Sequence, residues 1–221
     1  GNLSWARSKW KEYDEPVYTD PDQERIYKRE GRWTDVRYGY VSDGLFTSQA
    51  EIDALDYTYK DLNGNSSLRP GDIKYVDLNG DKVLDWRDQK EIGKGTLPTW
   101  TYGFNMNFKY HDFDLSALFQ GAFGYTTYID LTKAPSTLKF DNRWTEKEND
   151  PHSLVARPGG ASTNGYYSDF NNHNTAYLRL KNLSIGYNLP KALISKAGIQ
   201  QLRIYMAGTN LFTLSTLHKY G

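Results

Sequence analysis

The chain has 221 residues, and its 27 basic and 27 acidic side chains cancel, so its charge does not point to a nucleic-acid partner. It contains no cysteine, which excludes disulfide frameworks and thiolate metal sites. Hydrophobic residues make up only 38% of the chain whereas aromatic residues reach 15%, a balance typical of a β-rich protein with wet tyrosine and tryptophan surfaces. Because the chain starts at Gly1 without a signal peptide and stops abruptly at Tyr220-Gly221, we expect it to be a piece of a longer polypeptide.

Residues 1–10 contain the end of a predicted strand, and a long loop follows them. Leu3 and Trp5 alternate with polar neighbours, as the tail of a strand would. Residues 11–36 are charged, rich in tyrosine and interrupted by proline, so we expect an irregular loop there, within one very long connection over residues 11–99. Within it, Ser48 and Glu51 form a capping-box pattern that predicts one short helix.

One segment of this loop resembles a calcium-binding loop in its spacing. Oxygen side chains stand at loop positions 1, 3, 5, 9 and 12, and position 7 offers a backbone carbonyl; the six residues are Asp77, Asn79, Asp81, Val83, Asp85 and Asp88. Two departures weaken the pattern, since Lys82 replaces the usual glycine and Asp88 is shorter than the usual glutamate. The segment is therefore either a Ca²⁺ site or a turn in which the carboxylates cap neighbouring amides, and both interpretations stay open.

The clearest element is a hairpin over residues 100–121. Six apolar residues occupy every even position of its first strand: Trp100, Tyr102, Phe104, Met106, Phe108 and Tyr110. The odd positions are polar or small, and from Phe113 the apolar phase moves to odd numbers, with Leu118 the single exception. The connection at His111-Asp112 suits an antiparallel hairpin.

The length and end residues of this first strand go beyond an ordinary hairpin. Strands in soluble domains usually have about 5–6 residues, whereas a tilted strand that crosses a bilayer needs about 9–11. Rings at both ends with Phe and Met between them match the order of an outer-membrane barrel strand. Alternation alone does not distinguish this from a long hairpin whose apolar face lines the core of a soluble sandwich.

The rest of the chain repeats the pattern of long strands joined by unequal connections. Residues 122–176 form a second long loop, and residues 177–189 a strand whose apolar phase changes near Lys181, which predicts a bulge. Pro190 opens a short helix that Gly198 ends, and residues 201–212 form the last strand. Long loops (11–99, 122–176) thus alternate with short connections, as in up-and-down outer-membrane barrels with long extracellular loops and short periplasmic turns.

This alternation favours an all-β fold, an antiparallel transmembrane β-barrel portion with the long loops outside the cell. The six even-numbered residues of the first strand are then the lipid-facing ones. An enzyme is disfavoured, because the four histidines show no metal-ligand spacing and no nucleophile or phosphate motif occurs. Carboxylate pairs such as Asp141 and Glu146 lie in polar loops that contain many other acids.

Several ordered segments resemble one known family. They are Gly39–Phe46 with Ser48–Glu51, Pro70–Asp81 with Ile92-Gly93, Tyr102–Asn105, Phe113–Ser116 with Phe119–Gly121, Tyr177–Leu183 with Gly186-Tyr187 and Leu189-Pro190, and Leu202–Tyr205 with Asn210–Phe212. In this order and spacing they resemble the C-terminal barrel region of SusC/RagA-type TonB-dependent outer-membrane transporters, over most of the chain.

The resemblance implies a barrel with an N-terminal plug, energised by the TonB complex, that imports glycans or oligopeptides. It also implies a SusD-like surface lipoprotein as partner, outer-membrane lipids around the barrel, and a plug and closing strand that this chain lacks. Substrate contacts would come from polar inward residues and loop aromatics, for which the candidates are Tyr125, Trp144, Tyr166 and Tyr167. The alternative is a secreted calcium-dependent carbohydrate-binding β-domain that uses the Asp77–Asp88 loop and aromatic platforms.

Overall fold

The computed structural model describes residues 1–133 and 136–220, and they fall into two compact units. The first, here called the sheet unit, comprises residues 1–6, 97–125 and the chain from Thr175 onward. The second, here called the loop unit, comprises residues 7–96 and 126–174. Each unit is described separately.

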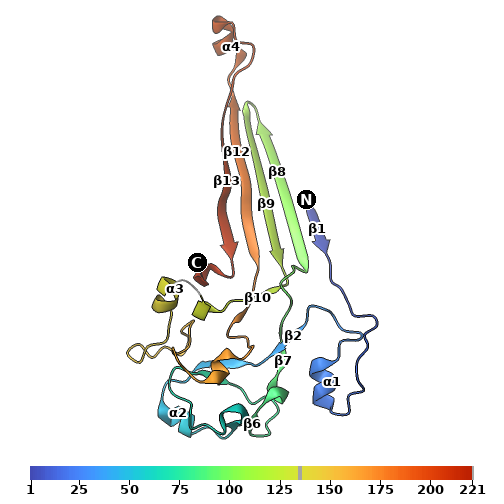
Figure 1. Ribbon diagram of the computed structural model, residues 1–221. Helices are drawn as coiled ribbons and strands as arrows, with labels where there is room; N and C mark the ends of the chain where they lie inside the picture. The colour runs from blue at the N-terminus through green and yellow to red at the C-terminus, as the bar shows by residue number, and fades with distance from the viewer. Residues whose placement is uncertain (134–135, 221) are drawn as a thin grey trace. The chain divides into compact units, whose positions relative to one another are not determined.

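The sheet unit is one antiparallel sheet in the order β1-β8-β9-β12-β13, and its strands follow one another side by side in Figure 1. The strands are β1 (Asn2–Trp5), β8 (Trp100–Tyr110), β9 (Phe113–Phe123), β12 (Tyr177–Asn188) and β13 (Arg203–Ser215). The four long ones have 11, 11, 12 and 13 residues, well above the length of about 5–6 usual in soluble domains. Such lengths, in an antiparallel all-β sheet, confirm the fold class that the alternation predicts.

Two short connections join the long strands at one end of the sheet. His111 and Asp112 link β8 to β9, and His111 adopts a positive φ of 50°. Helix α4 (Lys191–Ile194) and a 3₁₀ turn (Ser195–Ala197) lie between β12 and β13. Gly198 closes that turn in the left-handed conformation (φ 70°), where a glycine carries no Cβ penalty.

The predicted bulge lies in the middle of β12. Leu180 pairs with Phe119 of β9 and Asn182 pairs with Leu118, so Lys181 has no direct partner on β9. On the other side the register shifts at the same level, because β13 passes from Phe212 to Thr209 while β12 passes from Leu180 to Asn182. Because of this extra residue, the apolar side chains of β12 on both sides of the bulge lie on the same face of the sheet as the apolar side chains of β9.

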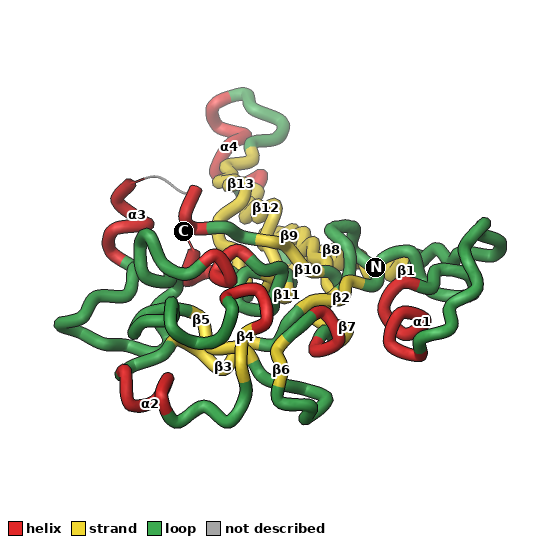
Figure 2. The backbone as a smooth tube through the Cα atoms, turned by 60° about the horizontal axis from the view of Figure 1, so that its bottom comes forward, coloured by secondary structure: helices red, strands yellow, loops and turns green. Residues whose placement is uncertain are grey.

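The loop unit is not the irregular connection that the sequence predicts. Its helices are α1 (Pro21–Tyr27), α2 (Gln49–Asp53) and α3 (Ser136–Asp141), and its strands are β2 (Arg37–Gly39), β3 (Ser42–Leu45), β4 (Thr58–Tyr59), β5 (Ile73–Tyr75), β6 (Val83–Leu84), β7 (Lys90–Gly93), β10 (Thr126–Tyr128) and β11 (Asn172–Asn174). Its 3₁₀ turns are Lys60–Leu62, Trp86–Asp88, Leu131–Lys133 and Ser162–Gly165, and the sheet unit has a further one at His218–Tyr220. The strands form two-stranded ladders, of which β4–β6 is parallel and β2–β7, β3–β5 and β10–β11 are antiparallel (Figure 2).

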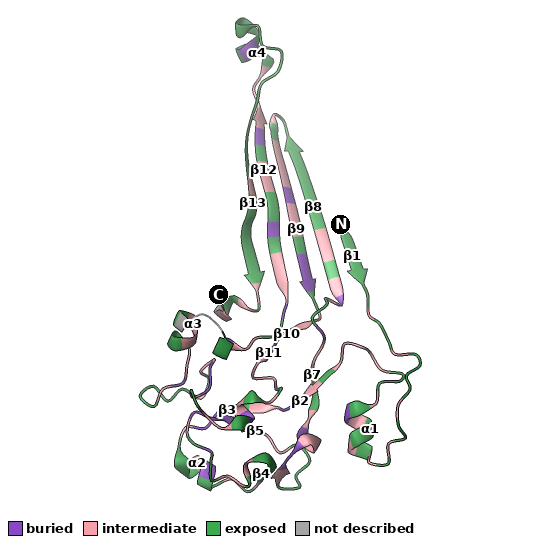
Figure 3. Ribbon diagram, viewed as in Figure 1, coloured by how far each residue is buried: buried purple, intermediate pink, exposed green. Residues whose placement is uncertain are grey.

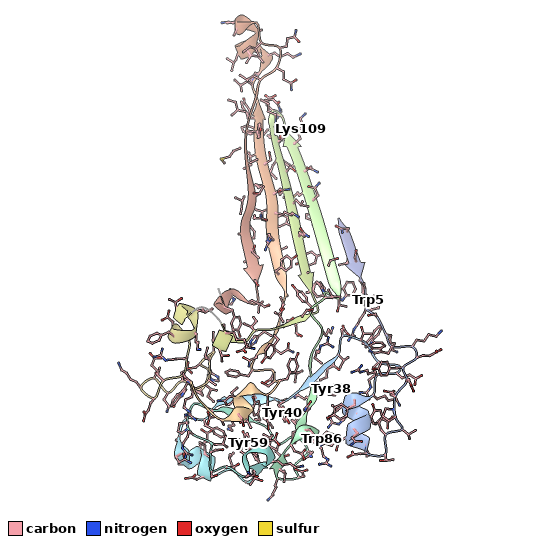
Figure 4. The ribbon with its side chains drawn as sticks, viewed as in Figure 1. Trp5, Tyr38, Tyr40, Tyr59, Trp86 and Lys109 are labelled. Carbon is pink, nitrogen blue, oxygen red and sulfur yellow. The ribbon has the colours of Figure 1, made fainter. Side chains whose placement is uncertain are left out.

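A hydrophobic core holds these short elements together. It comprises Tyr40, Leu45, Phe46, Ile52, Tyr59, Leu68, Ile73, Tyr75, Leu84, Trp144 and Ala156, all less than 10% exposed. Tyr40 and Tyr59 of this cluster are labelled in Figure 4. Burial raises the pKa of the Tyr40 hydroxyl to about 12. The sequence predicts a structured loop without core elements over residues 122–176. That prediction is wrong in one respect, because Trp144 and Ala156 pack in this core with residues distant in sequence.

Helix ends follow the local sequence rules. Ser48 caps α2 by accepting a hydrogen bond from the Glu51 amide (3.2 Å), as the capping box predicts, while Glu51 accepts from the Thr47 amide (2.9 Å). Asp20 caps α1, and Pro21 follows at its first position. Among the described residues, no helix combines the length and the apolar character needed to cross a membrane.

Candidate functional site

The sheet unit presents one continuous apolar face across all five strands. In register, Phe104 of β8 lies beside Phe119 of β9, which lies beside Leu180 of β12, which lies beside Phe212 of β13. The next rows repeat this, with Met106, Ala117, Leu183 and Gly208, and with Phe108, Leu115, Ile185 and Met206. Leu3 and Trp5 extend the face onto β1. The polar residues of every strand lie on the opposite face.

Much of this apolar face is exposed. Phe104 is 53% exposed, Phe108 59%, Ile204 62% and Met206 74%. Figure 3 shows β8 and β13 mostly in the colour of exposed residues. Soluble monomers rarely leave an apolar patch of this extent in water, so lipid or further protein must cover this face.

Aromatic rings gather at both ends of the apolar face. At one end Trp100 stacks on Phe123 with a centroid distance of 5.8 Å, and Trp5 is 6.3 Å from Trp100. At the other end Phe113 and Tyr187 are 4.5 Å apart. In Figure 4, Trp5 marks the first end of the sheet and Lys109 the second. Two bands of rings around an aliphatic centre match the two interfaces of a bilayer.

The polar face carries an ion pair and side-chain hydrogen bonds between strands. Arg203 donates to Asp114 through Nε (3.0 Å) and Nη2 (2.5 Å), a two-point contact that joins β13 to β9 across β12. Gly186 of β12 lies beneath this contact, since a Cβ there would be only 2.4 Å from Arg203 Nη2. Nearer the middle, Lys181 donates to Gln120 Oε1 at 3.0 Å.

The Asp77–Asp88 loop binds its own backbone. Asp77 accepts from the amides of Gly80 (2.8 Å) and Lys82 (2.9 Å), and Asp81 accepts from the amide of Val83 (2.9 Å). Asn79 accepts from the Asp81 amide at 2.8 Å. Lys82 takes the sharp turn that glycine usually makes, with φ 67°. The oxygens therefore already have amide donors, which is the turn interpretation of the sequence.

The last two acidic residues of this loop face the protein. Asp88 is fully buried and accepts from the amides of Leu78 (2.9 Å) and Asp85 (2.8 Å). Burial raises the pKa of Asp88, whereas the pKa of Asp85 is lowered, because the Arg87 amide and the Lys60 ammonium outweigh its burial. No group of three His, Asp or Glu side chains converges as a metal site within residues 1–133 and 136–220. Calcium binding by this loop stays a prediction.

The four loop aromatics proposed as substrate contacts do not share one environment. Trp144 is 7% exposed and packs over Gly71 in the core. Tyr166 stacks on Tyr40 at 4.6 Å and donates to Asp61. Tyr167 is 37% exposed and stacks on Tyr128. Tyr125 belongs to the sheet unit, where it is half-buried and burial raises its pKa. Substrate contact by these four residues remains a prediction.

A buried acid that sequence reasoning missed organises the loop unit. Asp72 is 0% exposed and accepts from the Arg69 amide (2.9 Å), the Ala161 amide (3.1 Å) and Asn164 Nδ2 (2.9 Å). Arg157 Nη2 lies 3.2 Å from both carboxylate oxygens. The signal in the sequence is weak, because an aspartate after Pro-Gly is usually a solvated turn residue.

Comparison with solved structures defines the class of fold. The chain matches a structure of the RagAB peptide transporter with a TM-score of 0.55 at 19% identity, over 91% of this chain and 21% of that one. The RagAB peptide importer in its open-open state gives a TM-score of 0.51 at 22% identity, over 89% and 20%. At this identity the likeness shows the fold: an antiparallel section of a transporter barrel.

Sequence relatives of the chain include TonB-dependent receptors. The chain is 33% identical over 196 residues to TonB-dependent receptor P3 of Formosa agariphila, covering 85% of this chain and 18% of the relative. It is 27% identical over 183 residues to TonB-dependent receptor SusC of Bacteroides thetaiotaomicron, covering 81% and 17%. No protein-family model matches the sequence. The chain is homologous to a section, less than one fifth in length, of these TonB-dependent receptors, and the resemblance to the SusC/RagA type is confirmed.

Proposed function

We propose that this chain forms part of the wall and outer loops of an outer-membrane TonB-dependent transporter. The transporter imports glycans or oligopeptides together with a SusD-like surface lipoprotein and draws energy from the TonB complex. The observation that carries the proposal is the apolar face five strands wide, with aromatic rings at both ends and polar residues behind it. The homology to TonB-dependent receptors and SusC supports the same function.

The two faces of the sheet have separate roles in this proposal. Lipid contacts the apolar face, whose predicted members on β8 are the even positions from Trp100 to Tyr110. The polar face lines the lumen, where Asn105 and Asn107 meet solute and water. A strand of 11 residues supports this, because it is long enough to cross the apolar layer at the tilt of about 45° typical of barrels.

A secreted carbohydrate-binding domain is the competing function. It would need the apolar face to be covered by a second layer of protein, and the homology to TonB-dependent receptors favours the transporter. The loop unit fits the transporter as an external structure, with a compact core and many aromatic side chains that water or solute can reach.

Cysteine scanning of β8 in the full-length protein tests the proposal. This section contains no native cysteine, and labelling of the unaltered full-length protein gives the background to subtract. We expect a membrane-restricted reagent to label Phe104→Cys and Phe108→Cys, and a water-soluble reagent to label Asn105→Cys and Asn107→Cys. If both reagents fail at the even positions while the odd ones react with the soluble reagent, the apolar face is a protein core and the transporter assignment fails.

A further inference from the structure

We propose that a basic, aromatic-lined pocket in the loop unit binds the acidic groups of an anionic oligosaccharide. The pocket has a volume of about 460 Å³ and lies between α1, the segment that follows it and Gln89, next to β7. This inference deepens the proposed transport function by naming the chemical class of one ligand. All residues that line the pocket lie between Trp10 and Gln89.

The charge of the pocket lining has one sign. Four cationic side chains line it, and no aspartate or glutamate does; the cations are Lys28, Arg29, Arg32 and Arg37. Lys28 is neutralised by Glu24 at 2.7 Å. For the three arginines, no carboxylate lies within 4.0 Å in the part of the chain that the structure describes. Three guanidinium groups without a direct ion pair around one cavity favour an anion.

The arginines keep donors available for a ligand. Arg37 uses Nη1 for the carbonyls of Thr34 (3.2 Å) and Val36 (3.0 Å), and its Nη2 and Nε have no hydrogen-bond partner among the described residues. Arg29 donates through Nη1 to the Tyr13 hydroxyl at 2.7 Å. A guanidinium with its remaining N–H groups free forms paired hydrogen bonds to a carboxylate or sulfate.

The walls of the pocket are rigid before any ligand arrives. Arg32 donates to the Glu24 carbonyl (3.0 Å) and the Arg25 carbonyl, which closes the C-terminus of α1. Arg25 in turn donates to the carbonyls of Gln89 and Arg87 (2.7 Å), which fastens α1 to the segment before β7. A preformed site loses less conformational entropy on binding than a flexible one.

Aromatic rings favour a sugar over a bare anion. Trp10, Trp33 and Tyr38 line the same cavity, and Tyr38 is labelled in Figure 4. All three are half-buried, so they present flat apolar area at fixed positions. The C–H faces of a sugar ring pack against such rings, while its carboxylate or sulfate groups meet the arginines.

The polar face of the sheet unit independently supports an anionic ligand. Four cations stand on the polar side of its strands and only one acid does; the cations are Lys109, Arg179, Lys181 and Arg203, and the acid is Asp114. Arg203 is paired with Asp114, which leaves an excess of positive charge. A lumen wall with this sign attracts anionic solutes.

Calorimetric titration of the purified full-length protein tests the inference with two matched probes, a tetrasaccharide of a uronic acid and its carboxyl-reduced neutral counterpart. We expect the acidic probe to bind more tightly, with an affinity that falls as salt is added. Arg37→Gln should weaken binding about tenfold, because it removes a charge-assisted contact. Arg69→Gln is the control, since Arg69 is also exposed and makes the same local contacts, Nη1 to the carbonyls of residues 66 and 68, outside the pocket.

Three results would overturn the inference. They are equal binding of the neutral probe, unchanged binding by Arg37→Gln, and Arg37-dependent binding of an acidic peptide without binding of the tetrasaccharide. The comparison of the two probes on the unaltered protein stands even if the Arg37 variant fails to fold. Uptake by cells is measured separately, so retained uptake together with any of these three results refutes the pocket while leaving the proposed function intact.

Discussion

The depth dependence of a charge on β8 gives the sharpest test of where the apolar face lies. Eleven residues at about 3.3 Å per residue span about 33 Å, which at a tilt of about 45° covers about 23 Å along the membrane normal. This matches the apolar band of about 25 Å in outer-membrane barrels. Met106 then lies within about 3 Å of the middle of the band, and Tyr110 at its edge.

Substituting arginine at these two positions should therefore have unequal costs. Met106→Arg should lower the free energy of unfolding by about 2–4 kcal/mol, and Tyr110→Arg by no more than about 1 kcal/mol, because the cost of a charge on the lipid face falls toward the interface. Asn107→Arg, on the polar face, is the matched control and should stay within about 0.5 kcal/mol of the unaltered protein. Urea unfolding of the full-length protein in lipid vesicles, followed by tryptophan fluorescence, measures all three.

Equal costs at Met106 and Tyr110 would refute this reasoning. A protein core has no depth gradient along a strand, so a charge should be costly wherever the side chain is covered. A small cost at both positions would mean that the apolar face contacts water. Only a large central cost with a small terminal one agrees with a bilayer.

Three further predictions concern the loop unit. Asp72→Ala should lower the free energy of unfolding by about 3–5 kcal/mol, because it leaves a half-buried arginine and several amides without their partner. The control Asp56→Ala, at an exposed residue, should change it by less than about 0.5 kcal/mol. Near-UV circular dichroism during unfolding measures both. Gly71→Ala should cost about 1–3 kcal/mol more than Gly64→Ala, since both have positive φ but only the first would place a Cβ 2.4 Å from a tryptophan ring; similar melting temperatures would contradict this. Ca²⁺ should raise the melting temperature of protein treated with a chelator, and Asp81→Ala should remove the rise. No rise in the unaltered protein would mean that the Asp77–Asp88 loop is a turn held by amide hydrogen bonds and not a Ca²⁺ site.

The sheet could be predicted from sequence because its information is local. Alternation over β8 and β9 records directly which side chains share a face, and the phase change near Lys181 locates the bulge that the register confirms. The short helix after Pro190 follows from the same kind of local signal. Asp20-Pro21, an N-cap followed by proline, is an equally good local signal for α1, which the prediction of an irregular loop over residues 11–36 missed.

The loop unit could not be predicted because its order is non-local. Its strands have two to four residues, too few to show a period, and its core joins residues as distant as Phe46 and Trp144. The basic pocket is hidden for a similar reason. Its arginines are spread over residues 29–37 among acids that cancel them in the sequence, and only the folded chain turns those acids away from the cavity.

The stepped register across the sheet has a consequence for insertions and deletions. Phe119, Leu180 and Phe212 lie side by side in one row of the sheet, and Leu118, Asn182 and Thr209 form the next row. From one row to the next, β9 therefore advances by one residue, β12 by two and β13 by three. Losing Lys181 would remove the bulge and leave strict alternation in β12, so Leu178 and Leu180 would stay on the apolar face with Leu183 and Ile185. Elsewhere in these strands, length can change only in steps of two without reversing the two faces. Homologous barrels should therefore vary by even increments along their strands and by odd ones only where a residue like Lys181 absorbs the difference.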